Sequence, residues 1–158
     1  MTKFITIAIK EAKNSELLQK HGSILICDEK IFSGYNHFTD HKNSIAIHAE
    51  EHAIRRFISW CRTKYFSDSY IRRKLRKSLL ITIRVKGDCI KCSAPCRDCI
   101  KLIKNYEIKQ IIYSDNIYDI DIDNEELEYQ CNLVNKKVRD IQNRPSSGYR
   151  WRERNKKK

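Results

Sequence analysis

The sequence predicts an α/β domain in which helices cover both faces of a parallel or mixed sheet. Two kinds of segment alternate along it, amphipathic stretches with helical spacing of apolar residues and short β-prone apolar runs. The chain has 158 residues, near the common size of a single domain that buries a substantial core. Apolar residues supply 41% of the sequence, a share that excludes a wholly disordered chain.

Three helices are expected, over residues 4–20, over residues 45–64, and from Pro95-Cys96 to about Tyr106. Proline suits the first turn of a helix, which places the start of the third one. In each helix the apolar positions lie on one side. They are Ile5, Ala8, Ile9, Ala12 and Leu17 in the first, Ala49, Ala53, Phe57, Trp60 and Cys61 in the second, and Ile100 and Ile103 in the third.

Four strands are expected between these helices. Residues 24–27 and 30–35 form a hairpin around the turn Asp28-Glu29, and polar residues 36–44 follow as a loop. Residues 79–85 begin as a continuous apolar run, which suits a buried strand, and Gly87-Asp88 ends it. Residues 108–113 form the last strand. The resulting strand–helix–strand order favours helices on the faces of the sheet.

Charge is distributed unevenly along the chain. There are 32 Lys and Arg against 20 Asp and Glu, a formal net charge of +12, which favours anionic partners such as nucleotides, nucleic acid or acidic surfaces. Residues 55–86 are basic, with Asp68 as their single acid, and residues 115–128 are acidic. The basic run is either a solvated helix face or a phosphate-binding strip. In the second case bases would stack on the neighbouring aromatic residues Tyr65, Phe66, Tyr70 and Trp151.

The cysteines and the two ends of the sequence indicate the cellular compartment and the domain boundaries. Four cysteines crowd into a short segment, Cys89, Cys92, Cys96 and Cys99, which is unlike a disulfide scaffold and suits metal-binding thiolates. No signal-peptide core and no membrane-length apolar run occur, so we expect an intracellular protein, cytoplasmic or nuclear and not secreted, with no membrane partner. Residues 1–143 are expected to form the catalytic domain, and residues 144–158 a basic, mobile tail.

Two short motifs carry the chemistry. His48-Ala49-Glu50 opens the second predicted helix, and Pro95-Cys96-x-x-Cys99 opens the third. One imidazole and two thiolates give tetrahedral zinc three protein ligands and leave its fourth position for water, the arrangement typical of a catalytic site. The Glu50 side chain is expected to point in a different direction from that of His48, so its carboxylate can exchange protons with that water without binding the metal.

Together the motifs resemble the signature of the zinc-dependent cytidine and deoxycytidylate deaminase superfamily, which includes tRNA adenosine deaminases. The likeness continues through His21-Gly22-Ser23 before the first strand, Gly34-Tyr35-Asn36 at the end of the second, and residues 108–114. It covers about residues 1–115. It implies a three-layer α/β/α fold with a mixed five-stranded sheet and one catalytic zinc held by His48, Cys96 and Cys99.

The resemblance also implies an activity and contacts to substrate. The expected reaction is hydrolytic removal of an amino group from a cytosine-type nucleotide or nucleoside, with Glu50 moving the protons. Asn36 would contact the base or sugar, and Ser93 and Ala94, before Pro95, would offer backbone contacts to the departing amino group. Ala94 stands where other members often carry glutamate. Relatives often assemble, so a homo-oligomer is compatible with the resemblance.

Several alternatives stay open on the sequence alone. The same machinery would serve adenine or cytosine in RNA or single-stranded DNA, and a non-catalytic nucleic-acid-binding protein could retain the fold. His48-x-x-Glu51-His52 also fits the inverted zinc-protease pattern, which leaves Cys96 and Cys99 unused. A second, structural zinc has four candidate ligands, or the four clustered cysteines form one knuckle. The candidates for the second zinc are His37, His41, Cys89 and Cys92.

Overall fold

The computed structural model describes residues 1–39, 46–87, 89–115 and 133–141. The elements along the chain are α1 (Thr2–Lys13), β1 (Lys20–Cys27), β2 (Lys30–Tyr35), β3 (His37–Phe38), β4 (Ala46–Ile47), α2 (Ala49–Thr63), α3 (Asp68–Lys77), β5 (Leu79–Lys86), β6 (Cys89–Lys91), α4 (Arg97–Asn105), β7 (Gln110–Ser114), β8 (Leu133–Lys137) and the 3₁₀ turn η1 (Val138–Asp140).

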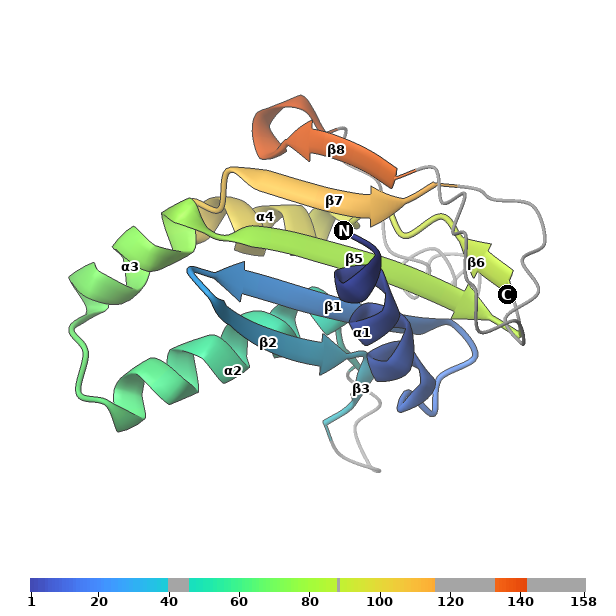
Figure 1. The fold of residues 1–158 in the computed structure, drawn as a ribbon, viewed down its shortest axis with the longest axis horizontal. Coiled ribbons are helices and arrows are strands. Elements are labelled where there is room, and N and C mark those ends of the chain that lie inside the picture. Colours follow the sequence, from blue (N-terminus) through green and yellow to red (C-terminus); the bar gives the residue numbers. More distant parts are fainter. Residues whose placement is uncertain (40–45, 88, 116–132, 142–158) are drawn as a thin grey trace, which may run out of the picture.

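The main sheet is mixed, as predicted. Its strand order is β2-β1-β5-β7-β8, and β6 adds a short sixth strand by pairing with β5 (Figure 1). Strands β5 and β7 are parallel, because α4 carries the chain across the sheet between them, and the other pairs are antiparallel. The five-stranded sheet implied by the resemblance corresponds to the main path. Its outer strand β8 was not foreseen.

Helices cover both faces, so the three-layer α/β/α architecture is confirmed. Helix α1 packs on one face of the sheet, while α2 and α4 pack on the other (Figure 1). The sheet has a hydrophobic core on each face, and alternate residues of a strand point into the two cores, because successive side chains of a strand point to opposite faces. In β5, for example, Leu80 belongs to the core under α2 and α4, and Ile81 and Ile83 belong to the core under α1.

The predicted elements form where their apolar patterns place them, with local differences. Helix α1 buries Ile5, Ala8, Ile9 and Ala12, but it ends at Lys13, so Leu17 lies beyond it. The hairpin turn is present, with Asp28 in the left-handed region at a φ of 53°, a conformation that aspartate tolerates. His21, Gly22 and Ser23 lie inside β1 and not before it.

Two other segments differ from the prediction. Part of the expected loop 36–44 forms β3, which pairs with β4, and α2 begins four residues later than expected, at Ala49. Helix α3 was not identified as a separate element, because only Ile71 and Leu75 of its ten residues are buried and its other positions are largely charged. Ser67 begins α3 by accepting a hydrogen bond from the Tyr70 amide.

Some expectations concern residues outside the described ranges. The predicted tail 144–158, the boundary at residue 143 and almost all of the acidic run 115–128 lie there. Among the described residues, no helix is both long enough and apolar enough to cross a bilayer.

Gly22 lets α1 approach the sheet. A Cβ atom at this position would lie 1.8 Å from the Ala8 carbonyl oxygen and 2.6 Å from the Ala12 nitrogen, both in the backbone of α1.

Gly22→Ala is therefore expected to lower the free energy of unfolding by about 3 kcal/mol or more in urea denaturation. Gly87→Ala is the control, because its φ of +57° disfavours a side chain but nothing lies within 4 Å. It should cost about 1 kcal/mol. Equal losses would contradict this account of Gly22.

Candidate metal centre and active site

The two motifs meet because two helices begin at the same place. His48 is the N-cap residue of α2 and Cys96 is the N-cap residue of α4, both with extended backbone. Cys99 lies in the first turn of α4, on the side that faces His48. The chain thereby brings three side chains together from segments about fifty residues apart, with partial positive charge from both helix N-termini around them.

The geometry of these three side chains fits zinc. The His48 Nδ1 atom is 3.1 Å from Cys99 Sγ and 3.5 Å from Cys96 Sγ, and the ligand atoms all lie within 4.8 Å of one another. Tetrahedral zinc with ordinary Zn–N and Zn–S bonds needs N···S separations of about 3.6 Å and an S···S separation of about 3.8 Å. Small side-chain rotations would meet these distances, so the cluster suits a zinc ion.

The electrostatics of the cluster also suit a cation. The hydrogen bond from Cys99, aided by the one with His48, lowers the pKa of the Cys96 thiol to about 4 although burial opposes this. The hydrogen bond with Cys96 raises the pKa of His48 to about 9, and the interaction with Cys96 raises that of Cys99 well above its usual value. Without metal, two protons are therefore shared among three ligand groups. A divalent cation would displace them, which couples metal binding to proton release.

Glu50 lies in the first turn of α2 beside this cluster and is only 5% exposed. Burial raises the pKa of its carboxyl group, whereas the neighbouring His48 lowers it. The Cys99 thiol is also among the groups that act on this carboxyl. A buried carboxyl group whose affinity for a proton is raised is better suited to accept and return a proton than an exposed one. By contrast, the Glu51 side chain is partly exposed and pairs with Arg55 at 2.6 Å.

Asn36 is held firmly at the start of β1, next to His21. Its Oδ1 atom accepts a hydrogen bond of 2.7 Å from the His21 amide, and its Nδ2 atom donates one of 2.6 Å to the Gln19 carbonyl. The side chain of Asn36 is therefore oriented by the start of β1. An amide nitrogen carries two hydrogens, so one N–H remains after the bond to Gln19.

Ser93 anchors the approach to α4. Its hydroxyl donates to the Thr82 carbonyl at 2.6 Å and accepts from the Ser114 amide at 2.9 Å, and its own amide donates to the Ser114 carbonyl at 2.8 Å. These bonds tie the segment before Pro95 to β5 and β7. Pro95 is buried and Ala94 is half-buried. The side chain of Ser93 is therefore committed to holding this segment in place.

The other candidate ligands do not join the cluster. Among the described residues, His48, Cys96 and Cys99 are the only group of three or more suitable side chains. His52, needed by the zinc-protease pattern, bonds the Tyr35 backbone through Nδ1 and packs against His37, with ring centres 4.6 Å apart. Cys89 and Cys92 enter no such group, and His41 lies outside the described residues.

Sequence reasoning gave no individual role to His21 and Arg84 beside the site. They are directly opposite each other on β1 and β5, and their side chains share the face that carries Leu25 and Leu80. Burial, aided by the charges of Arg84 and His48, lowers the pKa of His21 to about 4, although a hydrogen bond with the Gln19 carbonyl opposes this. A polar residue at a core-facing position near a strand end is the signal that could have identified both.

Among solved structures, one cytidine deaminase supports this architecture. A cytidine deaminase from Burkholderia pseudomallei is similar in structure over 88% of this chain and 93% of its own, with a TM-score of 0.58 and 12% sequence identity. A cytidine deaminase from Mycobacterium tuberculosis is similar over 75% and 86% of the two chains, with a TM-score of 0.49 and 11% identity. The comparison with curated protein sequences finds no match.

The family model for the cytidine and deoxycytidylate deaminase zinc-binding region matches residues 1–115. The matched range contains the whole His48, Cys96 and Cys99 cluster together with Glu50 and Asn36. Because this range is well over half of the sequence, and because the fold and the cluster agree with it, the chain belongs to the cytidine and deoxycytidylate deaminase zinc-binding family.

Proposed function

We propose that this protein is a zinc-dependent hydrolytic deaminase that converts a cytosine-type nucleotide or nucleoside to its uracil counterpart with release of ammonia. One observation carries the proposal: three zinc-competent side chains meet between two helix N-termini, with a buried carboxyl group beside them. In this proposal His48, Cys96 and Cys99 hold the metal and Glu50 is the catalytic residue.

The chemistry divides between the metal and the chain. Bound zinc lowers the pKa of a coordinated water to about 7, which supplies a nucleophile at neutral pH. The Glu50 carboxylate accepts a proton from the water that attacks C4 and delivers it to ring nitrogen N3. Glu50 then transfers the proton of the new C4 hydroxyl group to the exocyclic amino group, and the C4–N bond breaks to release ammonia as the C4 carbonyl forms. Its buried position keeps bulk water from competing for these protons.

The remaining site residues are proposed to position the base. The second N–H of the Asn36 amide would contact the base or sugar, because the first is occupied by Gln19. Backbone atoms of Ser93, Ala94 and Pro95 would contact the departing amino group, since the Ser93 side chain is committed to Thr82 and Ser114. These contacts would fix the ring relative to Glu50, where an error of 1 Å can cost about 100-fold in rate.

A positive charge near the site favours a phosphorylated substrate. Arg84 shares a strand face with His21, and its charge acts on that ring. Arginine is a good partner for phosphate because its guanidinium group donates two parallel hydrogen bonds. We therefore propose that nucleoside monophosphates are better substrates than nucleosides.

The test is ammonia release from a panel of substrates by the zinc-loaded protein. The panel contains dCMP, CMP, deoxycytidine, cytidine, AMP, a cytosine-containing single-stranded oligonucleotide and a tRNA. We expect turnover of the cytosine monophosphates, loss of turnover after chelation and its return on addition of zinc. Turnover confined to AMP would overturn the choice of base, and turnover confined to the oligonucleotide or the tRNA would overturn the choice of a free nucleotide. No turnover of any compound by protein with one zinc per chain would overturn the catalytic function itself.

A further inference from the structure

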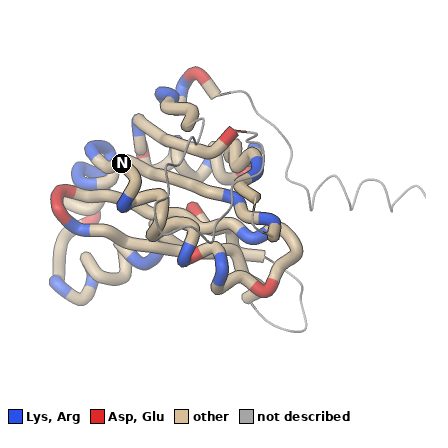
Figure 2. The backbone as a smooth tube through the Cα atoms, turned by 45° about the vertical axis from the view of Figure 1, so that its right-hand side comes forward, with Lys and Arg blue, Asp and Glu red and all other residues tan. Residues whose placement is uncertain are grey.

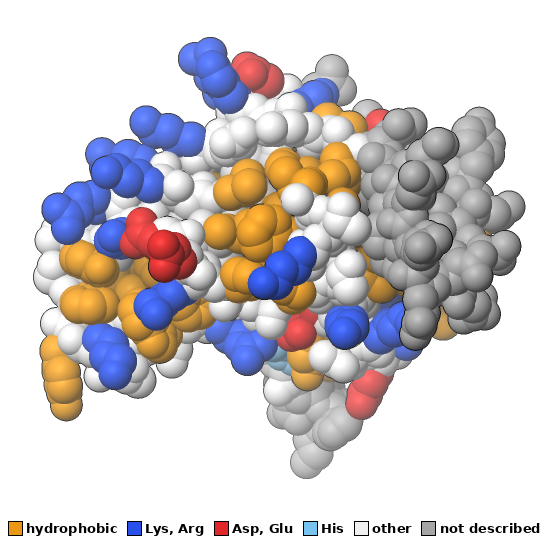
Figure 3. Space-filling view, viewed as in Figure 1, with side chains coloured by type: hydrophobic (Ala, Val, Ile, Leu, Met, Phe, Trp, Pro, Cys, Tyr) orange, Lys and Arg blue, Asp and Glu red, His pale blue; other side chains and the backbone are white. Residues whose placement is uncertain are grey.

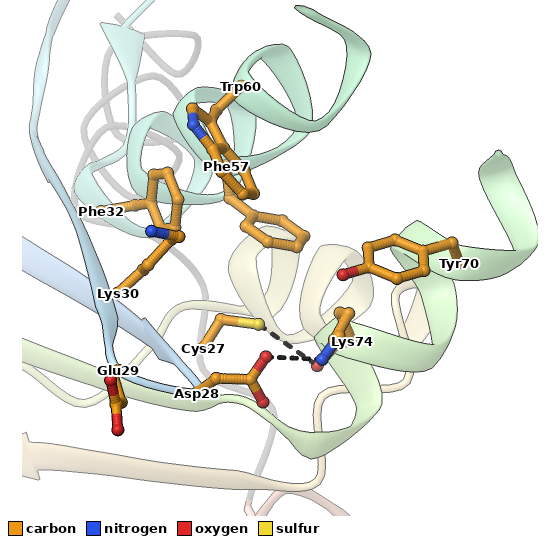
Figure 4. A pocket seen from close by; sticks show the side chains of 9 residues that line it. All are labelled: Cys27, Asp28, Glu29, Lys30, Phe32, Phe57, Trp60, Tyr70 and Lys74. Carbon is orange, nitrogen blue, oxygen red and sulfur yellow. Dashed lines mark hydrogen bonds and ion pairs between the residues drawn. The ribbon is translucent and has the colours of Figure 1, made fainter. Parts of the chain in front are cut away.

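The second half of α2 carries a feature that the deaminase centre does not use. A cavity of about 310 Å³ opens between the β1–β2 hairpin, α2 and α3. It is lined by Cys27, Asp28, Glu29, Lys30, Phe32, Phe57, Trp60, Tyr70 and Lys74 (Figure 4). Trp60 is twelve residues along α2 from His48, about 18 Å at the rise of a helix, so this cavity is distinct from the metal centre.

Aromatic rings form the walls of the cavity. Phe32 contacts Phe57 edge-on and Trp60 at a tilt, with ring centres 5.2 Å and 5.6 Å apart. Tyr70 stands across the cavity on α3 (Figure 4) and packs on Phe66 with ring centres 4.3 Å apart. Planar walls of this kind accept flat ligands, and a volume near 300 Å³ is at the lower end of ligand-binding pockets.

Cations stand beside these rings. Lys30 Nζ is 5.4 Å from the centre of the Trp60 ring, Lys74 Nζ is 5.5 Å from that of Tyr70, and the Arg73 guanidinium is 5.4 Å from Tyr70. Asp28, at the hairpin tip, lies at the edge of the cavity and pairs with Lys74, whereas the Glu29 side chain points away from the other labelled residues (Figure 4). Carboxylates can accept hydrogen bonds from the N–H groups of a base.

A basic surface continues outward from the cavity over α3 and the end of α2. Arg72, Arg73, Lys74, Arg76 and Lys77 follow one another along α3. Figure 2 shows Lys and Arg spread over much of the described backbone, and in Figure 3 the apolar side chains at the left end of the molecule lie among Lys and Arg, with a few acidic side chains between them. Some of these cations are neutralised, such as Arg76 by Glu107. Within the described ranges, others are exposed and form no ion pair, namely Lys30, Arg62, Lys64, Arg73 and Lys77.

Exposed aromatic surface extends the same strip. The Tyr65 side chain is 96% exposed at the C-terminal end of α2, where its φ of 56° turns the chain toward α3. Phe66, next to it, packs on both Trp60 and Tyr70. Rings interleaved with unpaired cations are typical of surfaces on which successive bases stack while basic side chains follow the phosphates.

We propose that this cavity and the basic strip around it bind single-stranded nucleic acid, with one base between Trp60 and Tyr70 and the adjoining phosphates on Arg73 and Lys77. The combination of features favours this ligand. A simple anion would need no aromatic walls, and an apolar ligand would need no ring of cations. A strand of nucleotides uses the rings, the Asp28 carboxylate and the cations together.

The test uses a fluorescein-labelled 12-mer of deoxythymidine. This ligand has no exocyclic amino group, so its binding does not depend on the proposed deaminase activity, and Glu50→Ala protein should bind it equally well. The chain has two tryptophans, Trp60 and Trp151. In Trp151→Phe protein, Trp60 is the one remaining tryptophan, and we expect the unlabelled strand to quench its fluorescence. In about 0.1 M salt, the strand concentration at half-quenching should equal the concentration at the midpoint of the anisotropy change measured with the labelled strand.

Substitutions separate stacking from charge. Tyr70→Ala should weaken binding by about tenfold through the loss of one stacking partner, whereas Tyr70→Phe should keep most of the affinity. The double variant Arg73→Glu, Lys77→Glu should weaken binding by tenfold or more and reduce the slope of log K against log salt by about 1.4. Thermal unfolding of each variant checks that the fold is intact.

A matched control removes the same charge elsewhere. Lys136 and Lys137 are exposed on β8, at the opposite edge of the sheet from the β1–β2 hairpin. Their double change to glutamate alters net charge by the same amount and should weaken binding less than threefold. Equal weakening by the two double variants, binding without Trp60 quenching, or equal competition by dTMP and the 12-mer would each overturn the proposal. Absence of binding at 0.05 M salt would also overturn it.

Discussion

Replacing Glu50 by alanine is expected to lower kcat for the best nucleotide substrate by about 10²–10⁴-fold, because the reaction loses the buried carboxyl group that is proposed to carry its protons. The Cβ and backbone of α2 stay in place, so the zinc content should remain near one per chain. Steady-state ammonia release and metal analysis of the same preparation measure both quantities. Glu50→Gln should be similarly impaired, since an amide of nearly equal shape cannot carry the proton.

Glu51→Ala is the matched control for this prediction. Glu51 is the next residue of the same helix and would be the base in the zinc-protease pattern. Its carboxylate pairs with Arg55, an i,i+4 contact worth a few tenths of a kcal/mol. We expect kcat within about twofold of the wild type for Glu51→Ala. A large loss for Glu51→Ala with a small loss for Glu50→Ala would reverse the assignment of the catalytic base.

Replacing Cys99 by alanine is expected to abolish stoichiometric zinc binding and, with it, deamination. Loss of an outer partner of a metal ligand costs 10- to 100-fold in metal affinity, and loss of a direct ligand should exceed about 100-fold. Zinc stabilises only the folded chain, so chelation should lower the Tm of the wild type but leave that of Cys99→Ala almost unchanged. Metal analysis and thermal unfolding with and without chelator measure these effects.

Cys92→Ala is the control for the ligand variant. Cys92 lies four residues before Cys96 but does not join the described cluster. If wild-type protein contains one zinc per chain and Cys92→Ala protein keeps it, the metal is assigned to His48, Cys96 and Cys99 alone. Two zinc ions in the wild type and one in Cys92→Ala would instead establish the second site predicted with His37, His41 and Cys89. Full zinc retention in Cys99→Ala would contradict the proposed ligand set.

The sequence predicted the elements whose patterns are regular over several turns or residues. Helix α1 follows from the spacing of Ile5, Ala8, Ile9 and Ala12, and β5 from a continuous apolar run. The sequence does not predict helix α3 and strand β8, because each contains few apolar residues. Their formation depends on packing against the rest of the molecule. Short strands β3 and β4 depend on their partners in the same way.

The ligand types and their order were readable from sequence, because zinc chemistry requires particular side chains at particular spacings. His48-Ala49-Glu50 and Cys96-x-x-Cys99 are local motifs, and each sits at a helix start that the sequence also predicts. Only the tertiary structure decided that His48 Nδ1 approaches both sulfurs while His52 turns to Tyr35. It also decided that Trp60 and Tyr70, from different helices, face one cavity. Contacts between distant segments follow from how helices pack on the sheet, which no local pattern specifies.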